Sequence, residues 1–146
     1  MAFILDPALE RDTVPIAMLQ LSLLRLHRDA NYPWLILVPK RQGLVELTDL
    51  DDTALGVLTS EIRQCSKVLQ ALFQPDKLNV AALGNQVRQL HVHVIARKIG
   101  DPAWPNPIWG AAAATPYDDD VLKSRKTLIA DTLASPKINE AFTTTL

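Results

Sequence analysis

The sequence predicts an α+β fold: an antiparallel sheet of about five strands with one long helix packed against it. Apolar, β-branched runs are grouped in pairs around short turn-forming segments, which is typical of hairpins. An apolar stripe with helical spacing over residues 49–73 separates the two predicted hairpins, and a second helix is predicted at 118–134. A chain of 146 residues can bury a sizeable core. We therefore expect residues 1–146 to form a single domain with its core at about 17–97.

The first predicted hairpin follows an N-terminal segment with a short helix at Pro7–Arg11. Apolar and polar residues alternate over Leu19–His27, and the alternation changes phase at 23–24, which predicts a strand with a bulge there. The segment 29–33, Asp-Ala-Asn-Tyr-Pro, is typical of a turn. Trp34–Val38 is a continuous apolar run, as expected for a central strand covered on both faces.

The long helix is predicted from apolar residues that recur at spacings of three and four, namely Leu55, Leu58, Ile62, Cys65, Leu69 and Leu72. Thr48 and Asp51 at its start have the spacing of a capping box. Pro75 is expected to end the helix, because proline cannot supply the backbone N–H that a continued helix needs.

The second predicted hairpin joins strands at Leu78–Leu83 and Val87–Arg97 through the connection Gly84-Asn85-Gln86. Residues 98–116 then hold four prolines, two glycines and two tryptophans, so we expect a loop. A loop of this length in a compact domain is usually functional. The segment 117–135 is expected to contain the C-terminal helix.

The composition argues against several classes of protein. The net charge is −1 and no basic stripe is present, so we expect no specific nucleic-acid surface. The apolar runs are too short to cross a bilayer, and the N-terminus lacks the pattern of a secretory signal. We therefore expect no membrane partner and a cytoplasmic location. Cys65 is the single cysteine, which leaves no internal disulfide and no multi-cysteine metal site.

The residues best suited to chemistry lie in the run Gln89-Leu90-His91-Val92-His93-Val94-Ile95. In a strand, alternate side chains point to the same face, so Gln89, His91 and His93 are expected to lie side by side. The Cα atoms of the two histidines would then be roughly 6.5–7 Å apart, a spacing that suits two groups that bind one phosphoryl group. Imidazole can act near neutral pH as nucleophile, acid, base or metal ligand.

Two other interpretations of this run stay open. The histidines can simply occupy an exposed strand face, because a bare His-x-His pattern has little specificity. They can also chelate a metal, but such sites want a third ligand, and the only other histidine, His27, lies on a different predicted strand.

The run and its surroundings resemble the histidine triad (HIT) family, in which three histidines alternate with apolar residues. The family has an apolar strand closed by proline, a long helix, a strand with an amide side chain, and a short polar connection into the histidine strand. Residues 17–97 follow that order. The rest of the chain, with Asp101-Pro102-Ala103-Trp104-Pro105 and Ile108-Trp109-Gly110, resembles a bacterial subgroup of the family, here with glutamine in the first triad position.

The resemblance implies a nucleotide hydrolase or nucleotidyl transferase that acts at an α-phosphate through a covalent nucleotidyl-histidine. By position, His91 would be the nucleophile, with His93 and Gln89 beside it. It also implies a homodimer, and the covalent step requires no metal or other cofactor. The expected substrate-binding residues are Asn79, Asn85, Gln86 and, as a nucleoside contact, Asp29. Trp104 and Trp109 are further candidates, since tryptophan offers a flat apolar surface to a nucleobase.

The chain departs from the family pattern at two positions. Gln89 stands where the first histidine belongs, and Trp34 stands where many members place an upstream histidine. Both changes remove titratable groups, and general acid–base catalysis typically contributes about 10²–10⁴-fold. Two alternative functions therefore stay open: a nucleotide-binding protein with degenerate catalysis, and a metal-dependent hydrolase that uses His91 and His93.

Overall fold

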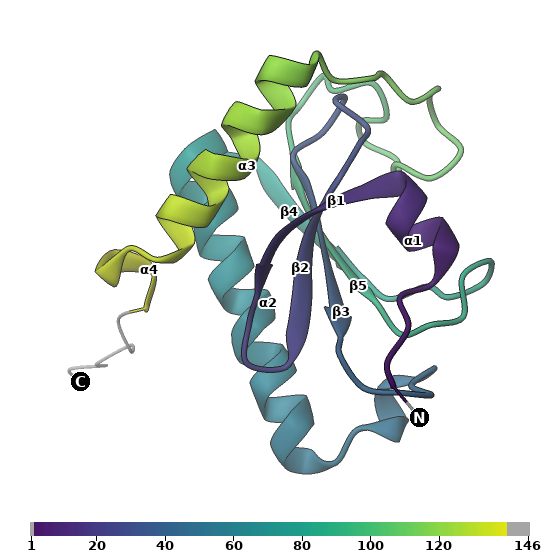
Figure 1. The fold of residues 1–146 in the computed structure, drawn as a ribbon. Helices are drawn as coiled ribbons and strands as arrows, with labels where there is room; N and C mark the ends of the chain where they lie inside the picture. The colour runs from purple at the N-terminus through teal and green to yellow at the C-terminus, as the bar shows by residue number, and fades with distance from the viewer. Residues whose placement is uncertain (1, 140–146) are drawn as a thin grey trace.

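The computed structural model describes residues 2–139, and its centre is a five-stranded antiparallel sheet in the order β1-β2-β3-β5-β4 (Figure 1). The predicted α+β class is confirmed. Residues 1 and 140–146 of the predicted single domain lie outside the described residues. The strands are β1 (Thr13–Met18), β2 (Ser22–His27), β3 (Trp34–Pro39), β4 (Lys77–Ala81) and β5 (Val92–Arg97).

The helices lie on both sides of this sheet. In Figure 1, α2 and α3 cover one side, whereas α1 lies on the other. None of the helices in residues 2–139 has the length and hydrophobicity that crossing a bilayer requires. The helices are α1 (Pro7–Asp12), the 3₁₀ turn η1 (Leu47–Asp49), α2 (Asp52–Phe73), α3 (Asp119–Leu133) and α4 (Pro136–Asn139).

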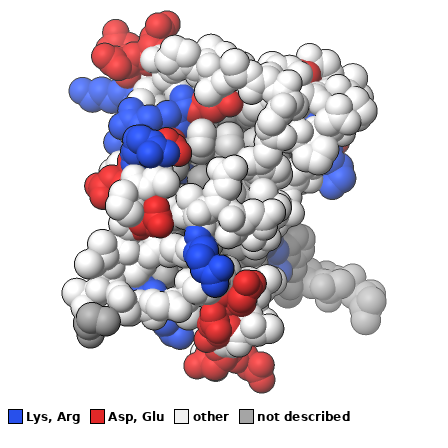
Figure 2. Space-filling model, turned by 90° about the vertical axis from the view of Figure 1, so that its right-hand side faces the viewer, with Lys and Arg blue, Asp and Glu red and all other residues white. Residues whose placement is uncertain are grey.

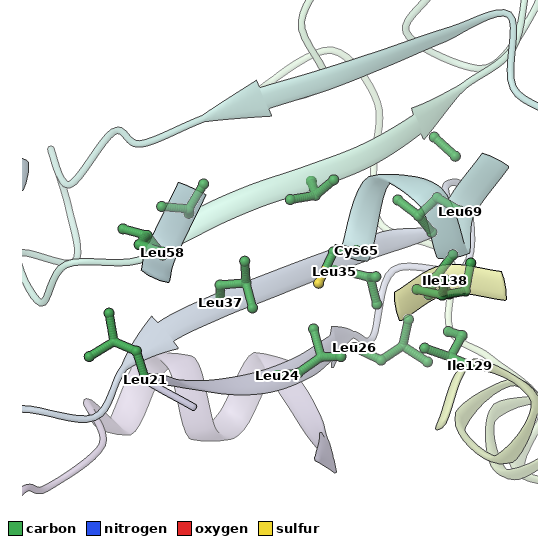
Figure 3. Close-up of a cluster of buried hydrophobic side chains, with 14 of the residues drawn as sticks. Leu21, Leu24, Leu26, Leu35, Leu37, Leu58, Cys65, Leu69, Ile129 and Ile138 are labelled. Carbon is green, nitrogen blue, oxygen red and sulfur yellow. The ribbon is translucent and has the colours of Figure 1, made fainter. Parts of the chain in front are cut away.

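The larger core lies between the sheet and α2. The predicted helical stripe is confirmed for its central part, because Leu58, Cys65 and Leu69 are buried, whereas Leu55 near the helix start is 39% exposed. Figure 3 shows leucines of β2 and β3 packed against these side chains, with Ile129 and Ile138 closing one end. One face of the sheet is therefore covered by the larger core, and the opposite face carries the histidines.

The predicted central strand is confirmed as β3, since all six of its residues are buried. Its second face packs against α1 and the loop of residues 98–116, which contains no helix or strand. This smaller core consists of Leu9, Tyr32, Trp34, Ile36, Val38, Ile95, Ala103 and Ile108.

The prediction of one bulged strand over 19–27 is wrong, because the chain forms β1 and β2 with a turn at 19–21. The irregularity in pairing lies in β1, between Pro15 and Ala17. Proline in an apolar run argues against a central strand, but β1 is an edge strand, where a missing N–H is tolerated. This is why the local pattern did not reveal β1.

The strands of the second hairpin are shorter than the predicted 78–83 and 87–97. β4 ends at Ala81, and β5 begins only at Val92. Residues 87–90 lie outside the sheet, and the Leu90 N–H donates to the Leu44 carbonyl at 3.0 Å instead of to a strand. His91 therefore lies immediately before the strand rather than inside it.

The predicted capping box of α2 is also shifted. Asp51 is the N-cap, and its carboxylate accepts a hydrogen bond from the Ala54 N–H at 2.8 Å. The helix ends at Phe73, and Gln74 follows with a φ of 47°. Pro75 thus lies just beyond the helix, close to where it was expected to end it.

Glu61 of α2 links the helix to the turn between β1 and β2. Its side chain is 2% exposed and accepts hydrogen bonds from the backbone N–H groups of Leu21 at 2.7 Å and Ser22 at 3.3 Å. We expect Glu61→Ala to lower the free energy of unfolding by roughly 3 kcal/mol, because two buried donors lose a charged acceptor. Urea denaturation measures this. Ser60→Ala, at an exposed neighbour on the same helix, should change the value by no more than about 0.5 kcal/mol, and an equal effect of both changes would contradict the assignment.

Candidate active site

His91 and His93 face a cavity on the side of the sheet opposite α2. His93 lies on β5 beside Ile36 of β3, and the two imidazole ring centroids are 4.9 Å apart, at an interplanar angle of 72°. Both residues are nearly buried, at 6% and 5% exposure. The cavity has a volume of about 320 Å³ and is lined by α1, the ends of β2 and β3, and the connection before β5. The predicted proximity of His91 and His93 is therefore present.

One hydrogen bond fixes the proton of His91. Its Nδ1 lies 2.6 Å from the backbone carbonyl oxygen of Gln89. A carbonyl oxygen only accepts, so Nδ1 must carry the proton and donate. In the neutral ring the lone pair is then on Nε2, the atom that a nucleophilic imidazole uses.

The opposite arrangement holds for His93. Its Nδ1 accepts a hydrogen bond from the Trp34 indole Nε1–H at 2.9 Å. The Trp34 ring also stacks on the ring of His27, with centroids 3.6 Å apart and an interplanar angle of 5°. The rings of His27, Trp34 and His93, from β2, β3 and β5, thus form a row, and the His93 ring at its end contacts the His91 ring.

Burial lowers the pKa of two of these histidines. The pKa of His93 falls to about 3, mainly through burial and secondly through the neighbouring His91 and His27. The pKa of His27 falls to about 4, again mainly through burial, which outweighs the raising effect of Asp12 and Asp29. Both rings are therefore neutral at physiological pH.

These lowered values predict that acid destabilises the fold. Between pH 6.5 and about 4 the unfolded chain binds protons at both histidines while the folded chain does not. Each histidine then contributes about 1.4 kcal/mol per pH unit, so going from pH 7 to 5.5 should cost roughly 2–3 kcal/mol. Urea denaturation at both pH values tests this, and His27→Gln should remove about half of the difference. A free energy of unfolding that is equal at the two pH values would contradict the expectation.

The connection before β5 supplies the polar groups that were expected at the site. Asn85 and Gln86 line the cavity together with Gly84. Gly84 has a φ of 77°, a conformation that favours glycine, and it turns the chain back toward β5. The two amide side chains are thus available to a ligand beside His91.

Trp109 reaches the same cavity from the 98–116 loop. Its ring meets His93 edge-on, with centroids 5.0 Å apart, and it meets Trp34 edge-on at 6.2 Å. The indole is 37% exposed, so one part of it remains open to a bound molecule.

The Gln89 side chain is hydrogen-bonded to the N-terminal segment. Its Nε2 donates to the Ile4 carbonyl at 2.8 Å, and its Oε1 accepts from the Asp6 N–H at 2.9 Å. Residue 89 precedes β5, and its side chain is not among those that line the cavity of His93; it lines a neighbouring cavity together with His91. Its contact with the site is made by its backbone carbonyl, which binds His91.

Asn79 and Trp104 are also not brought to the cavity. The Asn79 side-chain oxygen accepts from Arg97 at 2.8 Å, and Arg97 forms an ion pair with Asp101 at 2.7 Å. The guanidinium lies over the rings of Tyr32 and Trp104, 5.7 and 5.6 Å from their centroids. This cluster fastens the start of the 98–116 loop to the sheet.

Asp29 fastens the other end of that loop. It is buried, and its carboxylate accepts from the Asn31 N–H at 3.0 Å and from the Thr115 N–H at 3.1 Å. It lines a neighbouring cavity of about 380 Å³ that shares Asp12 and His27 with the first.

Several residues that line the cavity were not predicted from the sequence as site residues. His27 was available as a signal, because a histidine at the end of an apolar strand can reach the same face as the histidine strand. Ala8, Leu9, Asp12 and Thr13 gave no signal, since α1 reaches the cavity only through the folding of the whole chain.

The cavity is weakly charged. Among the described residues that line it, Asp12 alone carries a formal charge when the histidines are neutral. Figure 2 shows the face of the molecule that lies to the right in Figure 1. Few charged side chains appear in the upper right part of that face. Residues 2–139 contain no group of three His, Cys, Asp or Glu side chains placed to hold a metal ion.

Comparisons with known proteins agree with this fold. The HIT domain family model matches residues 8–100. A solved histidine triad protein from Bradyrhizobium japonicum is 43% identical, with 91% of this chain and 99% of that chain covered and a TM-score of 0.89. One from Sinorhizobium meliloti is also 43% identical (89% and 96% covered, TM-score 0.86), and one from Marinobacter aquaeolei is 39% identical (91% and 97% covered, TM-score 0.88).

A search of the curated proteins found no match. The narrower assignment to a bacterial subgroup with glutamine at the first triad position stays a prediction. The family model nevertheless covers well over half of the chain, and the fold agrees with that of the solved histidine triad proteins. The chain therefore belongs to the HIT (histidine triad) family.

Proposed function

We propose that the protein is a nucleotide hydrolase or nucleotidyl transferase that acts at an α-phosphate through a nucleotidyl-His91 intermediate. The observation that supports this most strongly is the hydrogen bond between His91 Nδ1 and the Gln89 carbonyl, because it leaves the Nε2 lone pair for attack. A buried imidazole with its other nitrogen fixed in this way is a preorganised nucleophile.

The surrounding groups have roles that follow from their chemistry. His93, with its Nδ1 occupied by Trp34, presents Nε2–H as a donor to a phosphoryl oxygen. Asn85 and Gln86 offer amide donors on the same side of His91. Phosphoryl transfer depends mainly on position and on stabilisation of the charge that develops, and these groups can provide both.

The nucleoside is proposed to occupy the other part of the cavity. Leu9, His27 and Trp34 form an apolar and aromatic surface there, and Trp109 adds an exposed indole. Asp12 can accept hydrogen bonds from ribose hydroxyls. The volume of about 320 Å³ lies in the range of small-molecule sites.

A second candidate is a nucleotide-binding protein without efficient turnover. The observation that favours it is the pairing of the Gln89 side chain with Ile4 and Asp6, which removes the first triad position from the cavity. Trp34 likewise offers no group that titrates.

A single-turnover experiment separates the two. The protein is mixed with a labelled dinucleoside polyphosphate in excess chelator, quenched without acid, and tested for acid-labile label on the protein. The proposed enzyme retains label and releases product, and no metal is required. Nucleotide binding without label or product would support the second candidate, whereas activity that chelator abolishes would indicate a metal-dependent hydrolase.

We also propose that the protein is a homodimer. β4 forms one edge of the sheet, and Val80 on that strand is 49% exposed. An apolar side chain on an unpaired edge suits pairing with a second copy. Sedimentation equilibrium tests the assembly.

A further inference from the structure

The hydrogen bond between Trp34 and His93 limits what His93 can do with protons. The indole Nε1–H can only donate, so His93 Nδ1 must be unprotonated as long as the 2.9 Å bond is present. Trp34 is 7% exposed on the central strand and stacks on His27, so it has little freedom to turn away. His93 is therefore held as the neutral ring with its proton on Nε2.

A neutral imidazole in this form can donate a hydrogen bond but is a poor acid. To become an imidazolium, His93 would have to take a proton on Nδ1, which would then face the indole N–H. Two donors facing each other in a site that is 5% exposed would leave both unsatisfied. Burial acts in the same direction, since it lowers the pKa of His93 to about 3.

The other ionisable groups that line the cavity do not replace this acid. His27 accepts the Asp29 N–H on its Nδ1 at 3.0 Å, so it too is held as the neutral Nε2–H form, and it stacks against Trp34. Asp12 is a carboxylate paired with Arg11 at 2.8 Å. His91 is the proposed nucleophile, and the proton on its Nδ1 is bound by the Gln89 carbonyl.

We propose that the site therefore acts on nucleotides whose leaving group departs as a stable anion without taking up a proton. Such substrates are mixed anhydrides, in which the α-phosphate is joined to another phosphate or to a carboxylic acid. Phosphoramidates and esters of alcohols, whose leaving groups need a proton, are poor substrates. This inference rests on the proposed function and specifies its substrate class.

The step balances without an acid. The Nε2 lone pair of His91 forms a bond to the α-phosphorus, and the bond from phosphorus to the leaving oxygen breaks, with its electron pair going to that oxygen. The Nδ1 proton stays on His91, whose ring becomes cationic and is stabilised by the Gln89 carbonyl. Water or another acceptor then attacks phosphorus, its proton passes to solvent, and the P–N electron pair returns to Nε2.

A series of adenosine 5′-phosphate aryl esters tests the proposal, because the phenols differ in acidity but little in shape. The measurement is the single-turnover rate of label transfer to the protein. Without an acid, the rate should fall on the order of tenfold for each unit by which the pKa of the phenol rises. Adenosine 5′-phosphoramidate should react far more slowly than a dinucleoside polyphosphate, which is a mixed anhydride of the proposed class. A rate that is independent of the phenol, or a phosphoramidate as fast as the anhydride, would overturn the inference.

Trp34→Phe tests the positioning role of the indole. The variant keeps a ring for the stack with His27 but lacks the N–H that faces His93 Nδ1. Mainly burial then opposes protonation of Nδ1, and the dependence on the phenol should become shallower. Trp109→Phe is the matched control, because it removes the other indole beside His93 but leaves the hydrogen bond from Trp34. Its rates should fall through weaker nucleoside binding, whereas the slope against the pKa of the phenol should stay as in the wild type. If Trp34→Phe does not fold, ¹⁵N NMR of the wild-type histidines decides instead: His93 should show a protonated Nε2 and an unprotonated Nδ1, and a protonated Nδ1 would overturn the inference.

The outcomes also separate this inference from the proposed function. If no leaving group gives label on the protein, the covalent mechanism itself fails. If label forms at equal rates along the series, the mechanism stands and the substrate class is wrong.

Discussion

His91→Ala is expected to abolish turnover and all covalent label. The variant removes the only Nε2 lone pair that the Gln89 carbonyl fixes in the cavity, so the rate should fall by at least roughly 10³-fold. Stopped-flow or quench-flow kinetics with a dinucleoside polyphosphate measure the loss. Nucleotide affinity should change much less, because the apolar and aromatic part of the cavity stays intact.

His27→Ala is the matched histidine variant. Its ring stacks on Trp34 and shares no hydrogen bond with His91, so the variant should react more slowly but still retain label. Circular dichroism and the unfolding midpoint of both variants show whether they are folded. Turnover by folded His91→Ala at the wild-type rate would remove His91 as the nucleophile.

The second large effect is expected at Asp101, which holds the 98–116 loop. Its carboxylate binds Arg97 through two hydrogen bonds of 2.7 and 2.9 Å, and it also accepts from the backbone N–H of Trp104 at 2.8 Å. Arg97 is 1% exposed, so Asp101→Ala leaves a buried guanidinium without its counter-charge. We expect a loss of roughly 3–5 kcal/mol in the free energy of unfolding, as for other buried ion pairs that lose one partner.

Arg11→Ala provides the comparison, because Arg11 forms an ion pair with Asp12 whose side chains are 71% and 45% exposed. Such an exposed pair contributes little, so the urea midpoint should stay within error. Arg97→Met combined with Asp101→Ala should cost less than the sum of the two single changes, since the double variant leaves no unpaired charge. Equal effects of Asp101→Ala and Arg11→Ala would contradict this account of the loop.

The ion pair also has a consequence for the site. The same loop carries Trp109, whose ring centroid lies 5.0 Å from that of His93. The loop is held on one side of Trp109 by Asp101 and on the other by the hydrogen bond from Thr115 to Asp29. A variant that loosens either anchor should therefore lower nucleotide affinity as well as stability. In this respect the length and proline content of the loop, which the sequence shows, have a physical reason: an irregular segment needs anchors of its own to hold one side chain in place.

Much of the fold follows from local patterns. The helix α2 and the strand β3 were predicted because burial of a helical stripe or of a whole strand leaves a direct pattern in the chain. The position of His91 and His93 on one side of the sheet follows from the two-residue period of a strand. These features depend on residues that are neighbours in sequence.

The parts that failed depend on distant partners. Gln89 binds the backbone of Ile4 and Asp6, more than 80 residues away in sequence, and no local pattern encodes that contact. Asn79 is turned to Arg97 rather than to the cavity because the buried guanidinium needs an acceptor. Trp34 was noted as a departure from the family, but its hydrogen bond to His93 depends on the pairing of β3 with β5.

The most direct test of the central claim is the location of the covalent intermediate. Cleavage after Arg88 and Arg97 releases the peptide Gln89–Arg97, which contains His91 and His93 and no other histidine. After a single-turnover reaction quenched at alkaline pH, mass spectrometry should find one nucleotidyl group on this peptide, and fragmentation should place it on His91. An adduct on His93 or on another peptide, or product formation with no adduct at any time, would contradict the account.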